Sequence, residues 1–72
     1  MSKSEEIKLK VLKILEENYP SDFSIGEIAK KANISRPTAS LWLKILSAEN
    51  KIEVSRKVGN AIFYKAKRKV HG

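Results

Sequence analysis

The segment 35–44 combines hydrogen-bonding, cationic and small side chains at spacings that suit contact with a nucleic acid. Arg36 can donate two N–H groups to the acceptor pair of a guanine. Thr38 and Ser40 can reach base edges or phosphate oxygens, and Pro37 offers an apolar edge to a thymine methyl group. This chemistry requires a helix that turns these side chains toward solvent, so that they can enter a groove of the duplex.

Further cationic side chains lie before and after this segment. Duplex DNA has closely spaced phosphates, and cations gain affinity by releasing condensed counterions, whatever the base sequence. Each cation alone could equally be a solvated surface charge. The candidates for phosphate contact are Lys30, Lys31, Lys44, Arg56, Lys57, Lys65, Lys67 and Arg68.

A well-marked helix start positions the segment. Ser24 has Glu27 three residues later, so each side chain can satisfy a free backbone N–H of the other residue, as in a capping box. Phe23 before the cap and Ile28 after it can pack together as a hydrophobic staple. We predict a short helix that begins after Ser24 and ends near Ala32.

A second helix follows the turn at 33–35. Ser35 can accept hydrogen bonds from the first-turn N–H groups, and Pro37 is tolerated there because its missing donor is not needed. The expected buried face contains Ala39, Trp42, Leu43 and Leu46. The opposite face contains Arg36, Pro37, Ser40, Lys44 and Ser47. The pattern predicts a helix over 35–49 with one buried face and one cationic, small-residue face.

Two further elements frame this helix pair. Ser4 is the expected cap of a first helix that Pro20 ends, with an inner stripe of Ile7, Val11, Ile14 and Leu15. Leu9 points away from that stripe, so Leu9 and Leu12 could form a self-association surface. From Ile52 the pattern alternates, and Gly59-Asn60 is a turn signal, which together predict a β-hairpin over 52–66.

Composition limits the function classes. The 72 residues allow one domain with a modest core, and the net charge of +7 favours a polyanionic partner. No acidic residue occurs between Glu27 and Glu49 or after Glu53. With no cysteine and one histidine, His71, the sequence offers no thiolate zinc site and no Ser-His pair. We therefore predict no enzyme activity and no cofactor.

The apolar runs are too short for a signal peptide or a membrane span. We accordingly expect a cytoplasmic, nucleoid-associated protein without a membrane partner. No segment suggests a domain for a small-molecule effector. The expected oligomeric state is a monomer or a weak homodimer.

The helix pair resembles the helix-turn-helix of winged-helix transcription regulators of the MarR-like, ArsR-like and Lrp-like kinds, in their small prokaryotic or archaeal form. In those families the motif commonly has a hydroxyl cap, Arg or Ser, Thr, a small residue, Ser and two leucines. The matching residues here are Ser35, Arg36, Thr38, Ala39, Ser40, Leu43 and Leu46. Asn50 stands where these families usually carry glycine after the helix, and asparagine also adopts the left-handed conformation.

The resemblance implies an α+β winged helix over 1–66, followed by a flexible basic tail at 67–72. It also implies a transcription regulator that binds double-stranded DNA, with helix 35–49 in the major groove. The hairpin 52–66 would be the wing, in contact with the backbone or the minor groove. The implied DNA-binding residues are Ser35, Arg36, Pro37, Thr38, Ser40, Leu41, Lys44, Arg56, Lys57, Asn60, Lys65, Lys67 and Arg68.

Two departures from the family pattern bear on specificity. Related helices often have a polar or basic residue at the position of Leu41, which could here touch a thymine methyl, pack under the wing or join Ile45 in a protein contact. Some winged helices bind left-handed DNA through an asparagine and a tyrosine one helical turn apart. Those positions correspond to Ser40 and Lys44, so the chain lacks the pair.

Two other functions stay open at this point. Winged helices also serve as protein-interaction modules in transcription or replication assemblies. The lysine excess and the basic tail would also suit an architectural protein that binds DNA with little regard to sequence.

Overall fold

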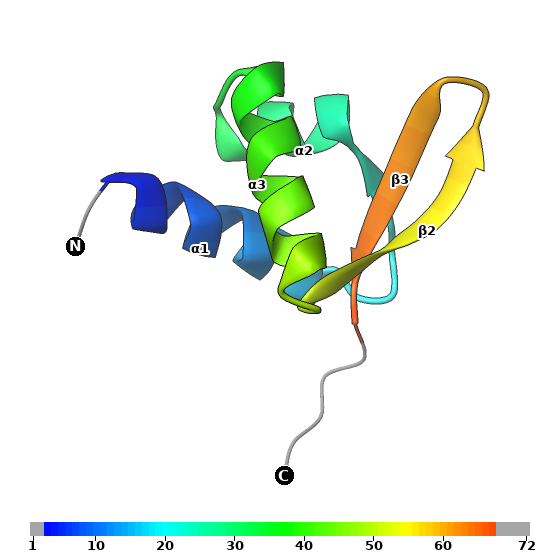
Figure 1. The fold of residues 1–72 in the computed structure, drawn as a ribbon, viewed down its shortest axis with the longest axis horizontal. Helices are drawn as coiled ribbons and strands as arrows, with labels where there is room; N and C mark the ends of the chain where they lie inside the picture. Colours follow the sequence, from blue (N-terminus) through cyan, green and yellow to red (C-terminus); the bar gives the residue numbers. More distant parts are fainter. Residues whose placement is uncertain (1–2, 68–72) are drawn as a thin grey trace, which may run out of the picture.

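The computed structural model describes residues 3–67, which form three helices and three strands (Figure 1). The elements are α1 (Lys3–Glu17), β1 (Phe23–Ser24), α2 (Ile25–Ala32), α3 (Arg36–Ala48), β2 (Ile52–Val58) and β3 (Ala61–Ala66). The strands form one antiparallel sheet in the order β1-β3-β2. The predicted α+β fold of a first helix, a helix pair and a hairpin is confirmed.

The cap residues place the helices of the helix-turn-helix as the sequence predicts. Ser24 Oγ accepts a hydrogen bond from the N–H of Glu27 at 3.2 Å, and Glu27 Oε1 accepts one from the N–H of Ser24 at 2.9 Å. The capping box is therefore confirmed. Ser35 Oγ accepts from the N–H of Thr38 at 3.3 Å, which confirms the cap of α3.

The turns that end α2 and α3 use asparagine in the left-handed conformation. Asn33 has φ 57° and Asn50 has φ 63°. A residue in this left-handed conformation ends a helix, and asparagine adopts it more readily than most residues other than glycine. At the other end of the chain, Ser4 lies inside α1, so the prediction that Ser4 caps this helix is wrong. Helix ends are the least certain part of any sequence pattern, since a shift of one or two residues costs little.

The core draws residues from every helix and from both long strands. The largest fully buried side chains are Val11, Leu15, Ile28, Leu43, Leu46 and Ile52. Each buried leucine or isoleucine contributes about 1.5–3 kcal/mol through removal of apolar surface from water. Trp42 packs partly buried against this cluster, in agreement with its predicted place on the inner face of α3.

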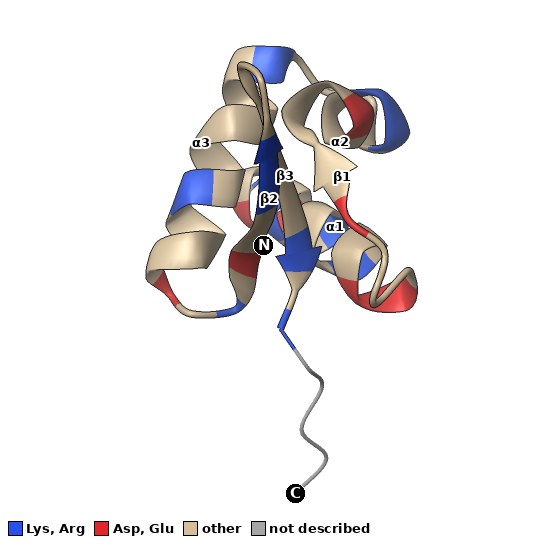
Figure 2. Ribbon diagram, turned by 90° about the vertical axis from the view of Figure 1, so that its right-hand side faces the viewer, with Lys and Arg blue, Asp and Glu red and all other residues tan. Residues whose placement is uncertain are grey.

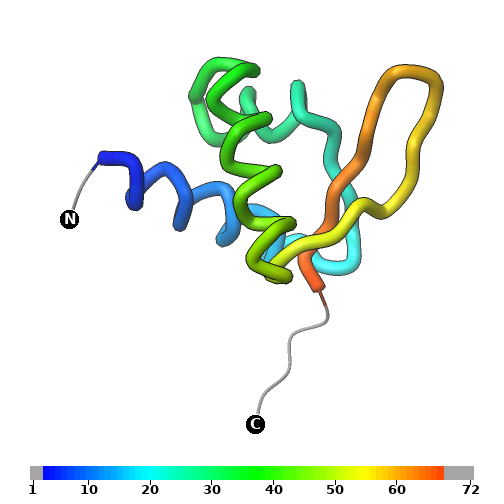
Figure 3. The backbone as a smooth tube through the Cα atoms, in the orientation of Figure 1, coloured from blue at the N-terminus to red at the C-terminus, as the bar shows by residue number. Residues whose placement is uncertain are grey.

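The hairpin stands beside α3, and its tip lies toward the end of the molecule at which α3 begins (Figures 1 and 3). Its register shifts by one residue between Val54 and Arg56 on β2, which leaves Ser55 as the extra residue of a β-bulge. Gly59 at the tip has φ 59°, a conformation that strains other residues.

The capping box gives a first prediction about stability. Replacement of Ser24 by Ala should lower the free energy of unfolding by about 1 kcal/mol, because the backbone N–H of Glu27 loses its acceptor, Ser24 Oγ. Urea denaturation followed by circular dichroism measures the change. Ser47→Ala within α3 is the matched control and should be neutral, since alanine is the better helix former. Equal effects of the two substitutions would contradict the energetic role of the cap.

Candidate nucleic-acid interface

The solvent-facing side of α3 is a straight row of exposed residues at spacings of four, three and four. We call this row, Pro37, Leu41, Lys44 and Ala48, the α3 stripe. It lies opposite the buried face, which consists of Ala39, Leu43 and Leu46. Leu41 is 53% exposed although it is a large apolar residue. The α3 stripe is therefore an apolar surface to which Lys44 adds a charge.

The predicted contact residues at the start of α3 are engaged within the protein. Ser35 Oγ donates a hydrogen bond to Thr38 Oγ1 at 2.8 Å, and Thr38 is half-buried. The guanidinium carbon of Arg36 lies 3.7 Å from the place that a Cβ on Gly26 would occupy. Arg36 thus leans over the first turn of α2, while Ser40 is half-buried one turn further along α3.

The bulge in β2 decides which wing residues face the helices. Residues opposite one another in an antiparallel pair point to the same face of the sheet. Ile62 packs against the core, so its partner Lys57 is on the helix side of the hairpin. Val54, the partner of the buried Tyr64, is on the same side and is 52% exposed.

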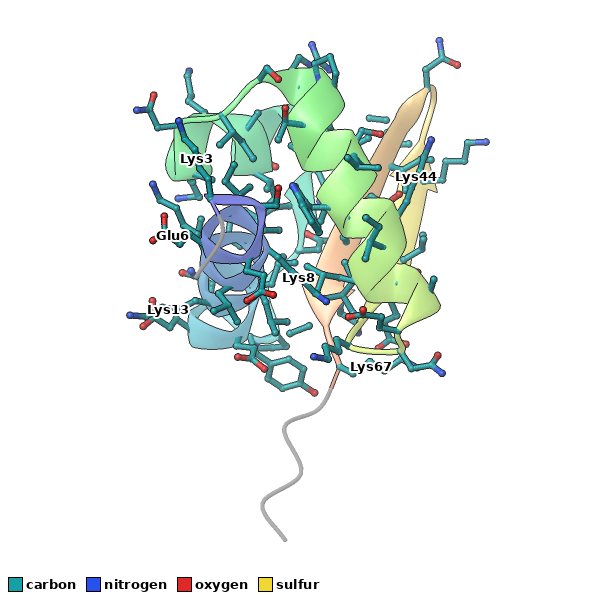
Figure 4. All side chains as sticks on the ribbon, turned by 60° about the vertical axis from the view of Figure 1, so that its left-hand side comes forward. Lys3, Glu6, Lys8, Lys13, Lys44 and Lys67 are labelled. Carbon is teal, nitrogen blue, oxygen red and sulfur yellow. The ribbon has the colours of Figure 1, made fainter. Side chains whose placement is uncertain are left out.

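Lys44 extends from α3 on the side where the hairpin stands (Figure 4). Helix α3 and strand β2 are in contact, and we call the α3 stripe together with the helix-side wing residues Val54 and Lys57 the helix–wing surface. By contrast, Lys3, Glu6 and Lys13 extend from α1 on the other side of the molecule.

Arg56 points to the outer face of the sheet instead. Its guanidinium stacks over the ring of Phe63, 4.4 Å from the centroid, and its Nε donates to Asp22 Oδ2 at 2.9 Å. Because Asp22 directly precedes β1, these three residues form a strap across all three strands, the Arg56 strap. The phosphate contact expected from Arg56 stays a prediction, and Asp22 would compete with a phosphate for the same guanidinium.

The strap sets the protonation behaviour of Asp22. A hydrogen bond from Ser55, and then the hydrogen bond and charge of Arg56, hold the pKa of Asp22 below its ordinary value, against an opposing effect of burial. Its side chain is 18% exposed. The ionised form of Asp22 is therefore the form that the folded hairpin stabilises.

Other predicted cations lie apart from the helix–wing surface. Lys65 is directly opposite Glu53 near the base of the hairpin. Lys67 donates from its Nζ to Asn50 Oδ1 at 3.3 Å and from its backbone N–H to the carbonyl of Lys51. Lys67 lies at the bottom of the molecule in Figure 4, away from the hairpin tip.

The remaining predicted contacts are spread over α2, the tip and the end of the chain. Lys30 and Lys31 are exposed on α2, and the Lys31 ammonium lies 5.2 Å from the centre of the Phe23 ring. Asn60 is exposed in the turn at the tip. Arg68 and the rest of the proposed tail, 68–72, lie outside the described residues.

No acidic residue lies on α3 or on the hairpin beyond Glu53. Figure 2 shows the acidic segments on α1, near β1, at the start of α2 and around the turn between α3 and β2. Glu49, at the end of α3, is paired with Lys8 at 2.8 Å and with Lys51 at 3.9 Å. The Lys8 hydrogen bond lowers the pKa of Glu49, so this carboxylate is neutralised by an ion pair that joins α1 to α3.

Two features of this region were not predicted from the sequence, namely Val54 as a surface residue and Asp22 as a partner of Arg56. The signal for Asp22 was weak, because the partners are 34 residues apart.

In the described residues, no group of three His, Cys, Asp or Glu side chains could hold a metal ion. None of the helices in 3–67 has the length and apolarity needed to cross a membrane.

The Arg56 strap predicts a specific pH dependence of stability. The pKa of Asp22 is lower in the folded protein than in the unfolded chain. The ionised carboxylate therefore adds to the free energy of unfolding above about pH 4, and this addition is lost as the pH falls through the folded pKa. Asp22→Asn should be less stable than the unmodified chain at pH 7, and the difference should shrink below about pH 4. Thermal or urea unfolding between neutral and acidic pH measures both quantities.

Glu53→Gln is the matched control, because Glu53 forms no ion pair among residues 3–67. It should leave most of the acid dependence in place. A stability difference between Asp22→Asn and the unmodified chain that does not change with pH would refute the ionic role of Asp22.

Comparison with known structures gives the same fold. No protein-family model and no curated protein sequence matches the chain. The Zα domain of PKZ from Carassius auratus, solved in complex with Z-DNA, superposes with a TM-score of 0.78 and 18% identity, over 92% of this chain and 100% of that one. Reduced HlyU from Vibrio cholerae N16961 superposes with a TM-score of 0.70 and 25% identity, over 83% of this chain.

The third similar structure belongs to an enzyme. Human N-acetylserotonin methyltransferase in complex with SAM superposes with a TM-score of 0.73 and 20% identity, over 90% of this chain but only 18% of that one. This chain likewise covers 59% of HlyU, whereas it covers the whole Zα domain. Each superposition covers most of the three helices and three strands of this chain, and the chain is a winged helix-turn-helix domain.

Proposed function

We propose that this protein is a transcription regulator that binds double-stranded DNA through the helix–wing surface. It would act by binding DNA and not by catalysing a reaction. Helix α3 would enter the major groove, whose width of about 12 Å accepts an α-helix. The wing would contact the backbone or the minor groove beside it, with Asn60 at its tip. The proposed site of action is DNA in the cytoplasm, on the nucleoid.

One observation carries this proposal. The helix–wing surface joins Lys44 and Lys57 on two neighbouring elements, and no acidic residue lies on α3 or on the hairpin beyond Glu53. A surface of this kind attracts phosphates without repulsion from nearby carboxylates. A protein-interaction module would not need such a charge arrangement around its exposed helix. HlyU and the Zα domain, which is bound to Z-DNA, share the fold with this chain.

The favoured duplex form is right-handed. The Zα domain has 18% identity to this chain, which supports the fold alone. At the two α3 positions where an asparagine and a tyrosine are expected for left-handed DNA, the chain has Ser40 and Lys44. A short hydroxyl and a flexible ammonium can meet phosphates or base edges, but neither provides an aromatic surface for contact with a left-handed duplex.

An alternating dC-dG duplex should therefore keep its right-handed circular dichroism spectrum when the protein is added.

The wing contact can be tested through its salt dependence. Lys57→Ala should weaken binding to every duplex by a similar factor and reduce the slope of log affinity against log salt by about one, because one cation no longer neutralises a phosphate. Fluorescence-anisotropy titration with a random duplex over a salt series measures this slope. Lys13→Ala, which removes the same charge from α1 on the other side, should leave the slope unchanged. Equal slopes for both variants would exclude the wing from the interface.

Arg36 should contribute in a different way. If its guanidinium leaves Gly26 and pairs with a guanine, Arg36→Ala should cost about 1–3 kcal/mol at one base position and little elsewhere. Titration of a duplex enriched by selection, and of its single-base variants, locates that position. Lys44→Ala is the control and should weaken all these duplexes alike. A uniform loss with Arg36→Ala would instead assign Arg36 to the phosphates.

A further inference from the structure

The α3 stripe has the wrong chemistry for an interface that depends on phosphates alone. Pro37, Leu41 and Ala48 are exposed and apolar, and Lys44 supplies the charge among them. An isolated exposed leucine is ordinary, but Leu41 lies in the middle of α3, one turn after the exposed Pro37 and one turn before Lys44. Across from α3, Val54 is also exposed on the helix side of the hairpin.

The surroundings of the stripe limit what can cover it. Lys44 and Lys57 lie on the same surface, and the acidic residues lie elsewhere. An apolar protein partner would have to bury these ammonium groups or supply carboxylates for them, and buried unpaired charges are costly. DNA instead offers phosphates to the lysines and an apolar group within the major groove.

We propose that Leu41, with Pro37 one turn before it, recognises the 5-methyl groups of thymines in the major groove. This inference rests on the proposed function, because it requires α3 to lie in that groove. Leu41 has no hydrogen-bonding group, and the thymine methyl is the apolar feature that the base edges present there. The proposal therefore assigns sequence preference to van der Waals contact and burial in the middle of α3.

The spacing within the stripe indicates how the thymines are arranged. Residues four apart on a helix are separated by about 6 Å along its axis. Base pairs of duplex DNA are about 3.4 Å apart along each strand. Contacts from Pro37 and Leu41 would thus reach methyl groups within about two or three base pairs of one another, and the preferred site should contain a short run or close pair of thymines.

Replacement of thymine by uracil removes the methyl group and leaves the base-pairing edge intact, so it tests the proposal directly. A duplex enriched by selection with the full chain is compared with the same duplex in which every thymine is uracil. The unmodified protein should bind the uracil duplex about fourfold more weakly for each thymine methyl that α3 touches, the factor expected for one buried carbon group. Random duplexes with thymine or uracil should differ by a smaller factor, because only some of their sites place thymines beside Leu41 and Pro37.

Leu41→Ala should reduce the preference for thymine over uracil to the part that Pro37 contributes, and it should leave the salt slope unchanged because leucine neutralises no phosphate. This exposed position tolerates alanine without loss of core packing. Lys44→Ala is the matched control on the same stripe. It should weaken binding to all duplexes and keep the thymine-to-uracil ratio of the unmodified protein.

The outcomes separate this inference from the proposed function. Tight binding to the selected duplex with no difference between thymine and uracil would overturn methyl recognition and leave DNA binding in place. A selected duplex that binds no better than random DNA would also overturn it and favour the architectural function. Absence of duplex binding even at low salt would overturn both proposals and leave the α3 stripe as a surface for a protein.

Discussion

Burial of one face of α3 is the constraint on which the rest of the surface depends. Leu43 and Leu46 are fully buried in a cluster that includes α1, α2 and the sheet, so α3 cannot rotate about its axis without exposing them. Since each leucine contributes about 1.5–3 kcal/mol, such a rotation would cost a large part of the stability of a small domain. The same packing therefore fixes Leu41 and Lys44 at the outer side, and a stable core also defines the candidate interface.

Few residues of the outer hairpin reach the core, so core packing does not position this part. The β-bulge at Ser55 and the contacts of Arg56 do so instead. The bulge at Ser55 separates the strand into an inner half that follows the core pattern and an outer half whose faces are exchanged. With strict alternation from Ile52, Arg56 would face the helices and Lys57 would face away. The bulge reverses this, so Arg56 can stack on Phe63 and pair with Asp22, while Lys57 joins the helix side. Because of the extra residue Ser55, Arg56 contacts Asp22 and Phe63 on the outer face of the sheet, while Lys57 lies on the helix–wing surface.

This division shows how far the sequence could predict the molecule. The helix-turn-helix was predictable because its signals are local: Ser24, Glu27 and Ser35 satisfy backbone groups within three residues. The hairpin could be placed from its alternation and its turn, but the face of Arg56 and Lys57 could not. A bulge depends on the register against β3, and the partner of Arg56 lies 34 residues away. The position of Arg36 over Gly26 is likewise a contact between elements, which helical periodicity does not reveal.

The candidate interface combines two kinds of energy that serve different purposes. Its lysines act over distances of about 10 Å at moderate salt and do not distinguish bases, so they would attract any duplex to the surface. Apolar side chains act only at contact, and their contribution depends on which group lies opposite. In the proposed complex, Leu41 would therefore favour one base over another only after the lysines have positioned α3 in the groove. The ion pair and ring contact of Arg56 join the wing to the rest of the sheet, so in the proposed complex Lys57 would position α3 in a similar way on every duplex, and Leu41 with Pro37 would discriminate between sequences.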